Sequence, residues 1–240
     1  EMTILFSDIR SFTTISEQMT PGENFAFINS YLGQMEPLIE QYGGFIDKYI
    51  GDAIMALFGN SPDDALQAAI AMLQELQQYN QNRQQNNRPP LRIGIGLHTG
   101  RLMLGTVGGA DRMDGTAIGD SVNLSSRVEG LTKTYGIPLL ITQQTFLGLK
   151  DPFEYDFRFI ERVTAKGKAK AVSLFEVFSA DPPDLRRAKN ASKGRFEKGV
   201  LLFHQQAFNE AAALFQECWE HCQDDRAAQM YRDRCQQQIR

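Results

Sequence analysis

The sequence predicts an α+β fold in which a largely antiparallel sheet is covered by helices. Strand-like segments occur mostly as neighbouring pairs, which is the pattern of antiparallel hairpins. A few amphipathic helical stretches separate these pairs and act as crossovers. The chain has 240 residues, of which 42% are hydrophobic and 22% charged, so it can bury one good core and a small appendage.

The first strand is expected over residues 2–9 and carries the carboxylate Asp8 near its end. Small hydroxyl residues from Ser11 onward can begin a helix, and a strand-to-helix junction exposes backbone N–H groups that suit phosphate. The run T-P-G-E at 20–23 forms a capping box with proline at the first helical position, and apolar residues follow at helical spacing. Pro37 lies inside this long helix and should kink or split it.

A hairpin is predicted over residues 43–59, where two short apolar runs flank Gly51-Asp52. Glycine tolerates positive φ, and a primed turn suits the twist of the strands. The turn places the Asp52 carboxylate at the tip of a rigid hairpin, and Lys48 lies on the strand leading into it. We interpret this hairpin as a binding element for a nucleotide and its metal.

The middle of the chain predicts a helix, a loop and two strands. Ser61-Pro62-Asp63-Asp64 is a helix start with two acids in the first turn. The Gln- and Asn-rich tract 80–90 is expected to be a loop. Residues 91–107 alternate like two strands that meet near residue 100. Their glycines superficially resemble a dinucleotide fingerprint, but no helix pattern follows, so a Rossmann fold is rejected.

Another strand is expected over residues 112–118, after which Gly119-Asp120-Ser121 opens a helix. Asn123 and Arg127 are four residues apart on this helix, so they project from one face of it. The remaining strands are expected at 137–142, 153–163 and 172–178.

A Pro-Pro pair near residue 182 marks a boundary, and we expect a main domain over 1–180 and a helical extension over 181–240. Three residues of the extension occur at the offsets of a helix-pair repeat and resemble a single tetratricopeptide unit: Gly199, Ala211 and Phe215. One repeat cannot bury its own apolar face. The extension should therefore pack on the main domain or on a partner helix.

Composition restricts the partners. The formal charge is −4, and no Lys/Arg run indicates nucleic acid or lipid headgroups as ligands. No apolar run reaches the length of a membrane span and no export signal opens the chain, so no membrane contact is expected from this segment. Three cysteines, all in the last quarter, fit a reducing cytoplasm. The chain begins within a strand-like run, so we expect a piece of a longer protein with upstream regulatory domains.

Asp8 and Asp52 both lie at strand ends, where two carboxylates with nearby backbone donors would suit a pair of divalent ions and a triphosphate. Each has a simpler interpretation on its own, with Asp8 as a helix cap and Asp52 as a turn residue. The surrounding motifs decide between these interpretations.

Three motifs occur in order: F-S-D-I-R-S-F-T at 6–13, F-I-D-K-Y-I-G-D-A-I-M-A-L-F at 45–58, and M-D-G-T-A-I-G-D-S-V-N-L-S-S-R at 113–127. Together they resemble the class III nucleotide cyclase catalytic domain over roughly residues 1–178, and within it the cyanobacterial-type, bicarbonate-responsive adenylate cyclases. The resemblance implies a ferredoxin-like α+β domain. It also implies a head-to-tail homodimer with two active sites, each shared by both subunits.

By motif match, the resemblance implies how metal and phosphates are held. Asp8 and Asp52, with the carbonyl of Ile9, would bind two Mg²⁺ or Mn²⁺ ions per site. The backbone of Phe12 and Thr13 would contact the β- and γ-phosphates.

The resemblance assigns the rest of the site to the other subunit. Lys48 and Thr116 would read the adenine edge, Asn123 would orient the ribose, and Arg127 would stabilise charge on the α-phosphate. Lys166 lies in a K-G-K turn and matches the family lysine that grips the terminal phosphates. Arg127 and Asn123 are the catalytic residues in this scheme.

The implied reaction converts ATP to 3′,5′-cyclic AMP and pyrophosphate. A lysine donates to adenine N1 and a threonine hydroxyl accepts from the 6-amino group, whereas guanine presents an N1–H donor and an O6 acceptor. Guanylate cyclases of the family usually have glutamate at the position of Lys48. Thr116 replaces the aspartate of animal transmembrane cyclases and matches the bicarbonate-activated group, so bicarbonate is an expected activator. Ser11 stands where many members have glycine.

Two other functions stay open at this point. One is a guanylate cyclase, which an assay with GTP against ATP would identify. The other is a catalytically silent cyclase-homology module that binds nucleotide or only dimerises. Silence usually shows as a lost metal carboxylate or a lost Asn/Arg pair. This chain retains both metal carboxylates and the Asn/Arg pair. A polymerase-like palm is disfavoured because no basic surface for a template is evident.

Overall fold

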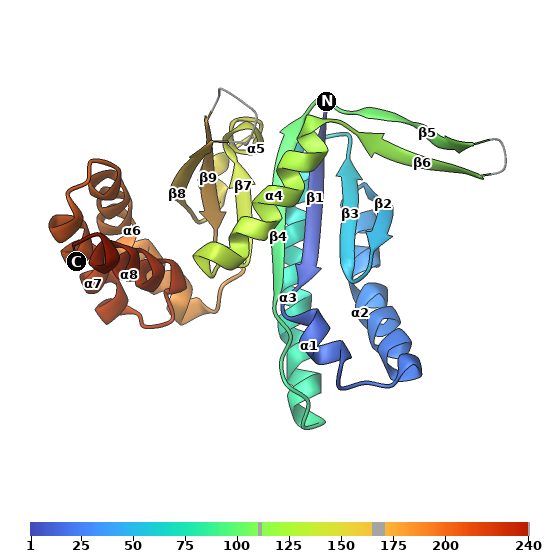
Figure 1. Cartoon of the computed structure of the whole chain (residues 1–240), viewed down its shortest axis with the longest axis horizontal. Coiled ribbons are helices and arrows are strands. Elements are labelled where there is room, and N and C mark those ends of the chain that lie inside the picture. The colour runs from blue at the N-terminus through green and yellow to red at the C-terminus, as the bar shows by residue number, and fades with distance from the viewer. Residues whose placement is uncertain (110–111, 165–170, 240) are drawn as a thin grey trace.

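A mixed seven-stranded sheet forms the centre of the molecule (Figure 1). The computed structural model describes residues 1–109, 112–164 and 171–239. The strands of the central sheet are β1 (Met2–Ile9), β2 (Gly44–Ile50), β3 (Ala53–Phe58), β4 (Ile93–Gly100), β7 (Leu139–Thr142), β8 (Phe157–Thr164) and β9 (Ala171–Val177). Their order is β2-β3-β1-β4-β7-β9-β8, and only the β4–β7 pair is parallel among these described strands. The predicted α+β class is confirmed.

Two further strands, β5 (Met103–Gly109) and β6 (Arg112–Ile118), form a separate antiparallel ribbon that projects from the sheet (Figure 1). The sequence predicted a second strand soon after residue 100, and β5 does begin there. It pairs with β6, however, and not with β4. The ribbon is therefore an arm beside the sheet, with Gly105 opposite Thr116.

Helices cover both faces of the sheet. They are α1 (Phe12–Ser16), α2 (Pro21–Gln41), α3 (Pro62–Gln85), α4 (Asp120–Tyr135), α5 (Gln143–Leu147), α6 (Pro183–His204), α7 (Phe208–His221) and α8 (Arg226–Ile239), with a 3₁₀ turn at Pro152–Glu154. Helices α2 and α3 pack on one face, and α4 packs on the other together with α6, α7 and α8 (Figure 1). None of the helices in the described part of the chain has the length and apolar character needed to cross a membrane.

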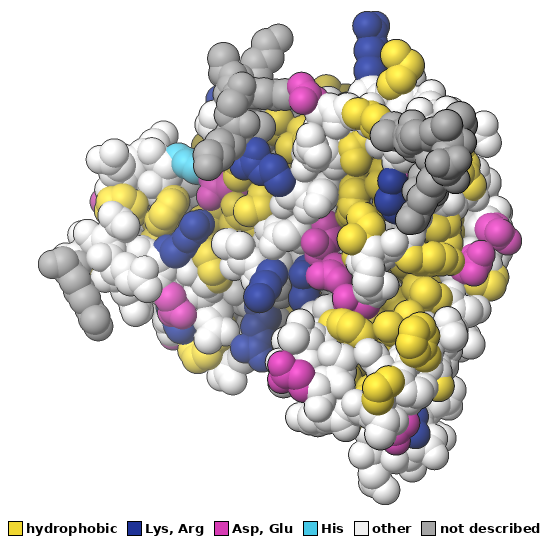
Figure 2. Space-filling view, turned by 45° about the vertical axis from the view of Figure 1, so that its right-hand side comes forward, with side chains coloured by type: hydrophobic (Ala, Val, Ile, Leu, Met, Phe, Trp, Pro, Cys, Tyr) yellow, Lys and Arg dark blue, Asp and Glu magenta, His cyan; other side chains and the backbone are white. Residues whose placement is uncertain are grey.

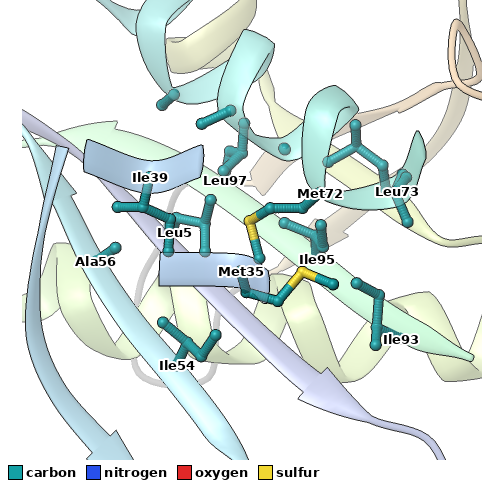
Figure 3. Close-up of a cluster of buried hydrophobic side chains, with 14 of the residues drawn as sticks. Leu5, Met35, Ile39, Ile54, Ala56, Met72, Leu73, Ile93, Ile95 and Leu97 are labelled. Carbon is teal, nitrogen blue, oxygen red and sulfur yellow. The ribbon is translucent and has the colours of Figure 1, made fainter. Parts of the chain in front are cut away.

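The main core lies between the sheet and helices α2 and α3 (Figure 3). Alternate residues of the strands face this core, as the two-residue period of a strand requires. The close-up labels Leu5, Ile54, Ala56, Ile93, Ile95 and Leu97 from the strands, and Met35, Ile39, Met72 and Leu73 from the helices. The intervening residues of β1, Ile4 and Phe6, are buried on the opposite face. Strand β1 is thus fixed on both faces, which makes its end a rigid support for Asp8.

Two local expectations can be compared with the structure. Helix α2 remains one element of 21 residues although it contains Pro37, so of the expected kink or split the split does not occur. Its buried residues lie on both sides of the proline, and their packing holds the turns that lack one backbone donor. The predicted loop at 80–90 is wrong for its first half, because α3 continues to Gln85. Arg83 stabilises this end, since its Nε donates to the carbonyl of Pro89 at 2.9 Å.

The C-terminal helices share a second core with the sheet, which confirms that the extension packs on the main domain. Residues from α4, β7, β8 and β9 meet Phe196, Phe215 and Tyr231 there. A Cβ on Gly199 would lie 2.9 Å from the Phe215 ring, so glycine lets α6 and α7 approach closely. The division at 180/181 and the likeness to a tetratricopeptide unit stay predictions.

A buried charge network also fastens the extension to the sheet. Arg158 of β8 is fully buried, and its two terminal nitrogens each donate to the Asp225 carboxylate at 2.7 Å. Its Nε donates to Glu176 of β9 at 2.6 Å. Lys189 of α6 donates to Glu176 and to Asp181, both at 2.6 Å. The network therefore joins two strands of the sheet to α6 and to the start of α8.

Candidate functional site

The carboxylates of Asp8 and Asp52 meet at one end of the central strands. Asp8 is near the end of β1, and Asp52 lies in the turn between β2 and β3, where Gly51 has a φ of 65°. Strand β3 pairs antiparallel with β1, which brings this turn beside the end of β1. The backbone N–H of Ile9 donates to Oδ2 of Asp52 at 3.1 Å. The structure thus brings together the three residues that the sequence proposed as metal ligands.

The electrostatics of this pair suit a divalent cation. Burial raises the pKa of Asp52 to about 7, and the neighbouring Asp8 carboxyl adds to the shift. A bound cation would relieve the repulsion between the two carboxylates. In the described part of the chain no group of three or more His, Cys, Asp or Glu side chains could hold a metal, so the pair offers two carboxylates beside backbone carbonyls, and water and phosphate could complete the shell. Magnesium in nucleotide enzymes is held in this way, so the residues fit the ion.

A short helix begins directly after Asp8. Ser11 precedes α1 with φ 58° and ψ 31°, a left-handed conformation that glycine adopts more easily than serine. Phe12 and Thr13 are the first residues of α1, and the N–H groups of a first helical turn have no partner within the helix. The Phe12 ring stacks on Phe27 of α2 with centroids 6.2 Å apart, which holds α1 in place.

Lys48 and Thr116 also meet, at the place where β2 touches the ribbon. The Lys48 ammonium donates a hydrogen bond to the Thr116 hydroxyl. Sequence reasoning did not single out Asp47, whose carboxylate accepts from the backbone N–H of Ala117 at 3.2 Å and from the Thr116 hydroxyl at 3.3 Å. The signal that could have identified Asp47 is its position in a strand, directly before Lys48. The two proposed base-reading residues therefore belong to one cluster within a single chain.

Asn123 and Arg127 lie on the exposed face of α4, as their spacing predicted. The opposite face of α4 is buried, and Ser125 donates to the carbonyl of Ile4 at 2.8 Å. Ile4 is four residues from Asp8, or about 13 Å along a strand at about 3.3 Å per residue. Further along α4, Glu129 pairs with Arg10 at 2.9 Å, so the helix runs beside β1 toward the carboxylate pair while Asn123 and Arg127 stay on its exposed face. Lys166, the remaining site residue, lies outside the described residues.

An apolar surface flanks these residues. We call it the ribbon–hairpin surface, and its exposed side chains are Phe45, Ile50, Met103, Leu104 and Ile118. Figure 2 brings this side of the molecule forward and shows hydrophobic side chains across it. Exposed apolar side chains gathered on neighbouring elements are typical of interaction sites. The surface suits a partner that would cover the hairpin and the ribbon together.

Comparison with known proteins places this geometry in a family context. The family model described as "Adenylate and Guanylate cyclase catalytic domain" matches residues 1–176. An adenylate cyclase of Anabaena cylindrica is 50% identical over 182 residues, which cover 73% of this chain and 36% of that protein. The terminal-differentiation-specific adenylate cyclase of Dictyostelium discoideum is 38% identical over 245 residues, which cover 100% of this chain and 11% of that protein. The chain thus spans about a third or less of the length of these curated relatives.

Solved structures of both base specificities are similar to this one. The guanylyl cyclase Cya2 aligns with a TM-score of 0.65 at 32% identity, covering 76% of this chain and 93% of that chain. The adenylyl cyclase CyaB from P. aeruginosa aligns with a TM-score of 0.63 at 32% identity, covering 73% and 92%. Fold similarity alone therefore does not distinguish ATP from GTP.

Proposed function

This chain belongs to the family of adenylate and guanylate cyclase catalytic domains, and we propose that it acts as an adenylate cyclase that converts ATP into 3′,5′-cyclic AMP and pyrophosphate. The carboxylate pair of Asp8 and Asp52 carries the proposal, because the raised pKa of Asp52 and the place of the pair beside the start of α1 suit a metal-bound triphosphate. Two relatives that are 50% and 38% identical are both called adenylate cyclases, which supports the choice of ATP.

Asp8 and Asp52, with the carbonyl of Ile9, would hold two Mg²⁺ or Mn²⁺ ions. When bound, these ions lower the pKa of the ribose 3′-hydroxyl and neutralise charge on the leaving pyrophosphate. The N–H groups at Phe12 and Thr13 would bind the β- and γ-phosphates at the start of α1. The 3′-oxygen would then form a bond to the α-phosphorus as its proton passes to solvent water. The bond from that phosphorus to the bridging oxygen breaks, and pyrophosphate keeps the electron pair.

The second half of the site comes from a partner copy in a homodimer. Asn123 orients the ribose, and Arg127 meets the charge that grows on the α-phosphate. Lys166 belongs to the same proposal and would grip the terminal phosphates. Asn123 and Arg127 are exposed on α4, on the side opposite its buried face, which supports a shared site, and so does the exposed ribbon–hairpin surface.

ATP is selected through Lys48 and Thr116. The lysine donates to adenine N1, and the threonine hydroxyl accepts from the 6-amino group. GTP is the competing substrate, since the similar guanylyl cyclase Cya2 matches as well as the adenylyl cyclase CyaB does. Parallel assays with ATP and GTP separate the two activities, and an excess of cyclic GTP would overturn the choice of ATP.

The central test is production of cyclic AMP by purified protein with ATP and Mg²⁺ or Mn²⁺. Arg127→Ala should keep the fold and lose about 10³-fold or more in turnover, as arginines that stabilise phosphoryl-transfer charge do. Near-normal turnover in Arg127→Ala would contradict its role. No cyclic product from either nucleotide would instead favour the silent cyclase-homology module.

Mixing inactive variants tests the shared site. Asp52→Ala and Arg127→Ala chains should each be inactive alone. An equal mixture should recover about a quarter of wild-type activity, because half of the dimers are mixed and each mixed dimer has one intact site of two. A mixture that stays inactive while forming mixed dimers would refute sharing between subunits.

Bicarbonate activation is a further part of the proposal and rests on Thr116. Sodium bicarbonate should raise turnover relative to sodium chloride at the same pH and ionic strength. Equal turnover in the two salts would remove bicarbonate from the proposal.

We also propose that this domain works in the cytoplasm under upstream regulatory domains of a longer protein. Cys218, Cys222 and Cys235 are all free thiols, which fits a reducing compartment. Cell fractionation of the full-length protein, with the catalytic domain detected by antibody, tests the location.

A further inference from the structure

Strand β2 contains a bulge at Asp47. Ile46 is paired with Ala56 and Lys48 with Met55, so Asp47 is an extra residue that has no opposite partner on β3. Neighbouring side chains of a regular strand point to opposite faces, and a bulge changes the direction of the side chains around it. Here the neighbours Asp47 and Lys48 both reach Thr116 on β6.

The Asp47 carboxylate is largely buried, with 6% of its side chain exposed. One oxygen accepts from the backbone N–H of Ala117 at 3.2 Å, which ties β2 to the ribbon. The other oxygen lies 3.3 Å from the Thr116 hydroxyl and 3.5 Å from the Lys48 ammonium. An ionised carboxylate can only accept hydrogen bonds. The Thr116 hydroxyl proton has two acceptors in reach, the Asp47 carboxylate at 3.3 Å and the Ala117 carbonyl at 3.5 Å, and the charged carboxylate is the nearer and the stronger acceptor, so the hydroxyl donates to it.

This orientation determines what Thr116 can offer to a nucleotide base. A hydroxyl has one proton and two lone pairs, and here the proton is directed to Asp47 while Lys48 also donates to the oxygen. The remaining capacity of the hydroxyl is that of an acceptor. An acceptor matches the 6-amino donor of adenine and faces the O6 acceptor of guanine unfavourably.

We propose that Asp47 is a positioning residue for base specificity, which holds the Thr116 hydroxyl as an acceptor and so selects ATP over GTP. The inference rests on the proposed cyclase function and adds a residue to it. Lys48 and Thr116 would touch the base, whereas Asp47 acts through Thr116. The bulge makes this arrangement possible, because it lets consecutive residues serve the same hydroxyl.

Asp47→Asn tests the direction of the hydroxyl with almost no change in shape. The amide oxygen can still accept from the N–H of Ala117, but the amide nitrogen now donates toward the Thr116 hydroxyl. The hydroxyl then accepts from this amide nitrogen and turns its proton toward the base, where it suits guanine O6. We expect the ratio of kcat/KM for ATP to kcat/KM for GTP to fall roughly ten- to hundredfold, the usual effect of one mismatched base contact.

A double-mutant cycle separates this role from a structural one. Thr116→Val removes the hydroxyl, so adding Asp47→Asn to it should cause no further change in the ATP/GTP ratio. If the carboxylate only stabilised the fold, its loss would lower kcat/KM for ATP and for GTP together and leave their ratio unchanged. Asp63→Asn is the matched control, because Asp63 is also buried and its carboxylate accepts from Ser61 and from the backbone N–H of Lys150, neither of which belongs to the base-reading cluster.

The outcomes are distinct. A wild-type ratio in a folded Asp47→Asn protein overturns the inference, and so does a ratio change that persists in the Thr116→Val background. If Asp47→Asn does not fold, Thr116→Ser and Thr116→Val provide the test: serine keeps the oriented hydroxyl and should keep the ratio, whereas a wild-type ratio in Thr116→Val overturns the inference.

Failure of the proposed cyclase activity would be recognised separately, as absence of product from wild-type protein. The same variants can then be compared by equilibrium titration with 3′-deoxy-ATP and 3′-deoxy-GTP, which cannot cyclise. The dissociation constants should shift in the same direction as the kinetic ratio, toward the guanine nucleotide in Asp47→Asn. Unchanged relative affinity in this variant counts against Asp47 whether or not the protein turns over.

Discussion

Replacing Arg158 by methionine should destabilise the fold by about 3 to 5 kcal/mol, the usual effect of removing one partner from a buried ion pair. Methionine keeps an unbranched side chain in a site that is fully buried. Glu176 would retain Lys189 as a partner, with its Nζ at 2.6 Å. Asp225 would lose both of its bonds to Arg158 and keep the N–H of Ala228 at 3.2 Å. Most of the loss should therefore arise at Asp225.

Urea denaturation of wild-type and Arg158→Met protein measures this loss. Thermal unfolding gives a second measurement. At about 2 to 4 °C per kcal/mol for a chain of this size, the melting temperature should fall by roughly 6 to 20 °C. Arg187→Met is the matched control, because Arg187 is 78% exposed and pairs with Asp184, which is 91% exposed. That variant should stay within about 0.5 kcal/mol of wild type.

A second substitution identifies the cause. Arg158→Met combined with Asp225→Asn should be more stable than Arg158→Met alone, because the carboxylate left without its cation is gone. Burial raises the pKa of Asp225, but Arg158 and Lys189 together lower it by more, so the folded-state pKa is below its ordinary value. A group of this kind contributes stability at neutral pH that is lost as pH falls through its folded pKa. A loss below about 1 kcal/mol in Arg158→Met, or no recovery in the double variant, would refute the network as the fastening of the extension.

Three further predictions concern the site and its surroundings. Burial and then Asp8 raise the folded pKa of Asp52 from 3.8 to about 7, so metal-free wild type should lose stability relative to Asp52→Asn as pH rises from 3.8 to about 7. Urea denaturation in EDTA measures this, and parallel curves would contradict it. The stability of Ser11→Gly should stay within about 1 kcal/mol of wild type, because glycine fits the left-handed conformation of residue 11. Ser11→Val introduces a β-branched side chain there and should lose about 1 to 2 kcal/mol. Thermal unfolding compares the two variants, and equal stability would argue against strain at this residue. Ile118→Glu on the ribbon–hairpin surface should weaken dimerisation at least about tenfold, since a charge would be buried at the interface. Leu201→Glu on the exposed part of α6 is the control and should leave dimerisation unchanged. Sedimentation measures both, and an unchanged dimer in Ile118→Glu would exclude this surface as the dimer interface.

Local sequence signals predicted the elements that depend on a few neighbouring residues. The capping box at the start of α2 forms in both directions, with Glu23 accepting from the Thr20 backbone at 2.8 Å and Thr20 accepting from Glu23 at 3.3 Å. The Gly51-Asp52 turn forms as expected, with positive φ at the glycine. These features are decided within four residues, so the pattern is sufficient.

Features that depend on distant partners were missed. The alternating run in β8 gives no sign that Arg158 is fully buried, because its partner Asp225 is 67 residues away. The ribbon was missed for a similar reason, since β5 and β6 each read as ordinary strands and their choice of partner is not local. The bulge at Asp47 is a matter of register between two strands, so neither strand alone reveals it.

The β2–β3 hairpin links the two chemical tasks of the proposed enzyme. At its turn, Asp52 meets the end of β1 through the N–H of Ile9, on the side where metal would bind. Four residues earlier, Lys48 and the bulge at Asp47 meet the ribbon, on the side where the base would be read. In the proposed head-to-tail dimer these two ends would serve different active sites. Ile50 lies between them, is 54% exposed in the single chain, and belongs to the ribbon–hairpin surface. A partner that covers Ile50 would immobilise the segment joining both ends, so association would order the metal carboxylate of one site and the base-reading cluster of the other in the same step.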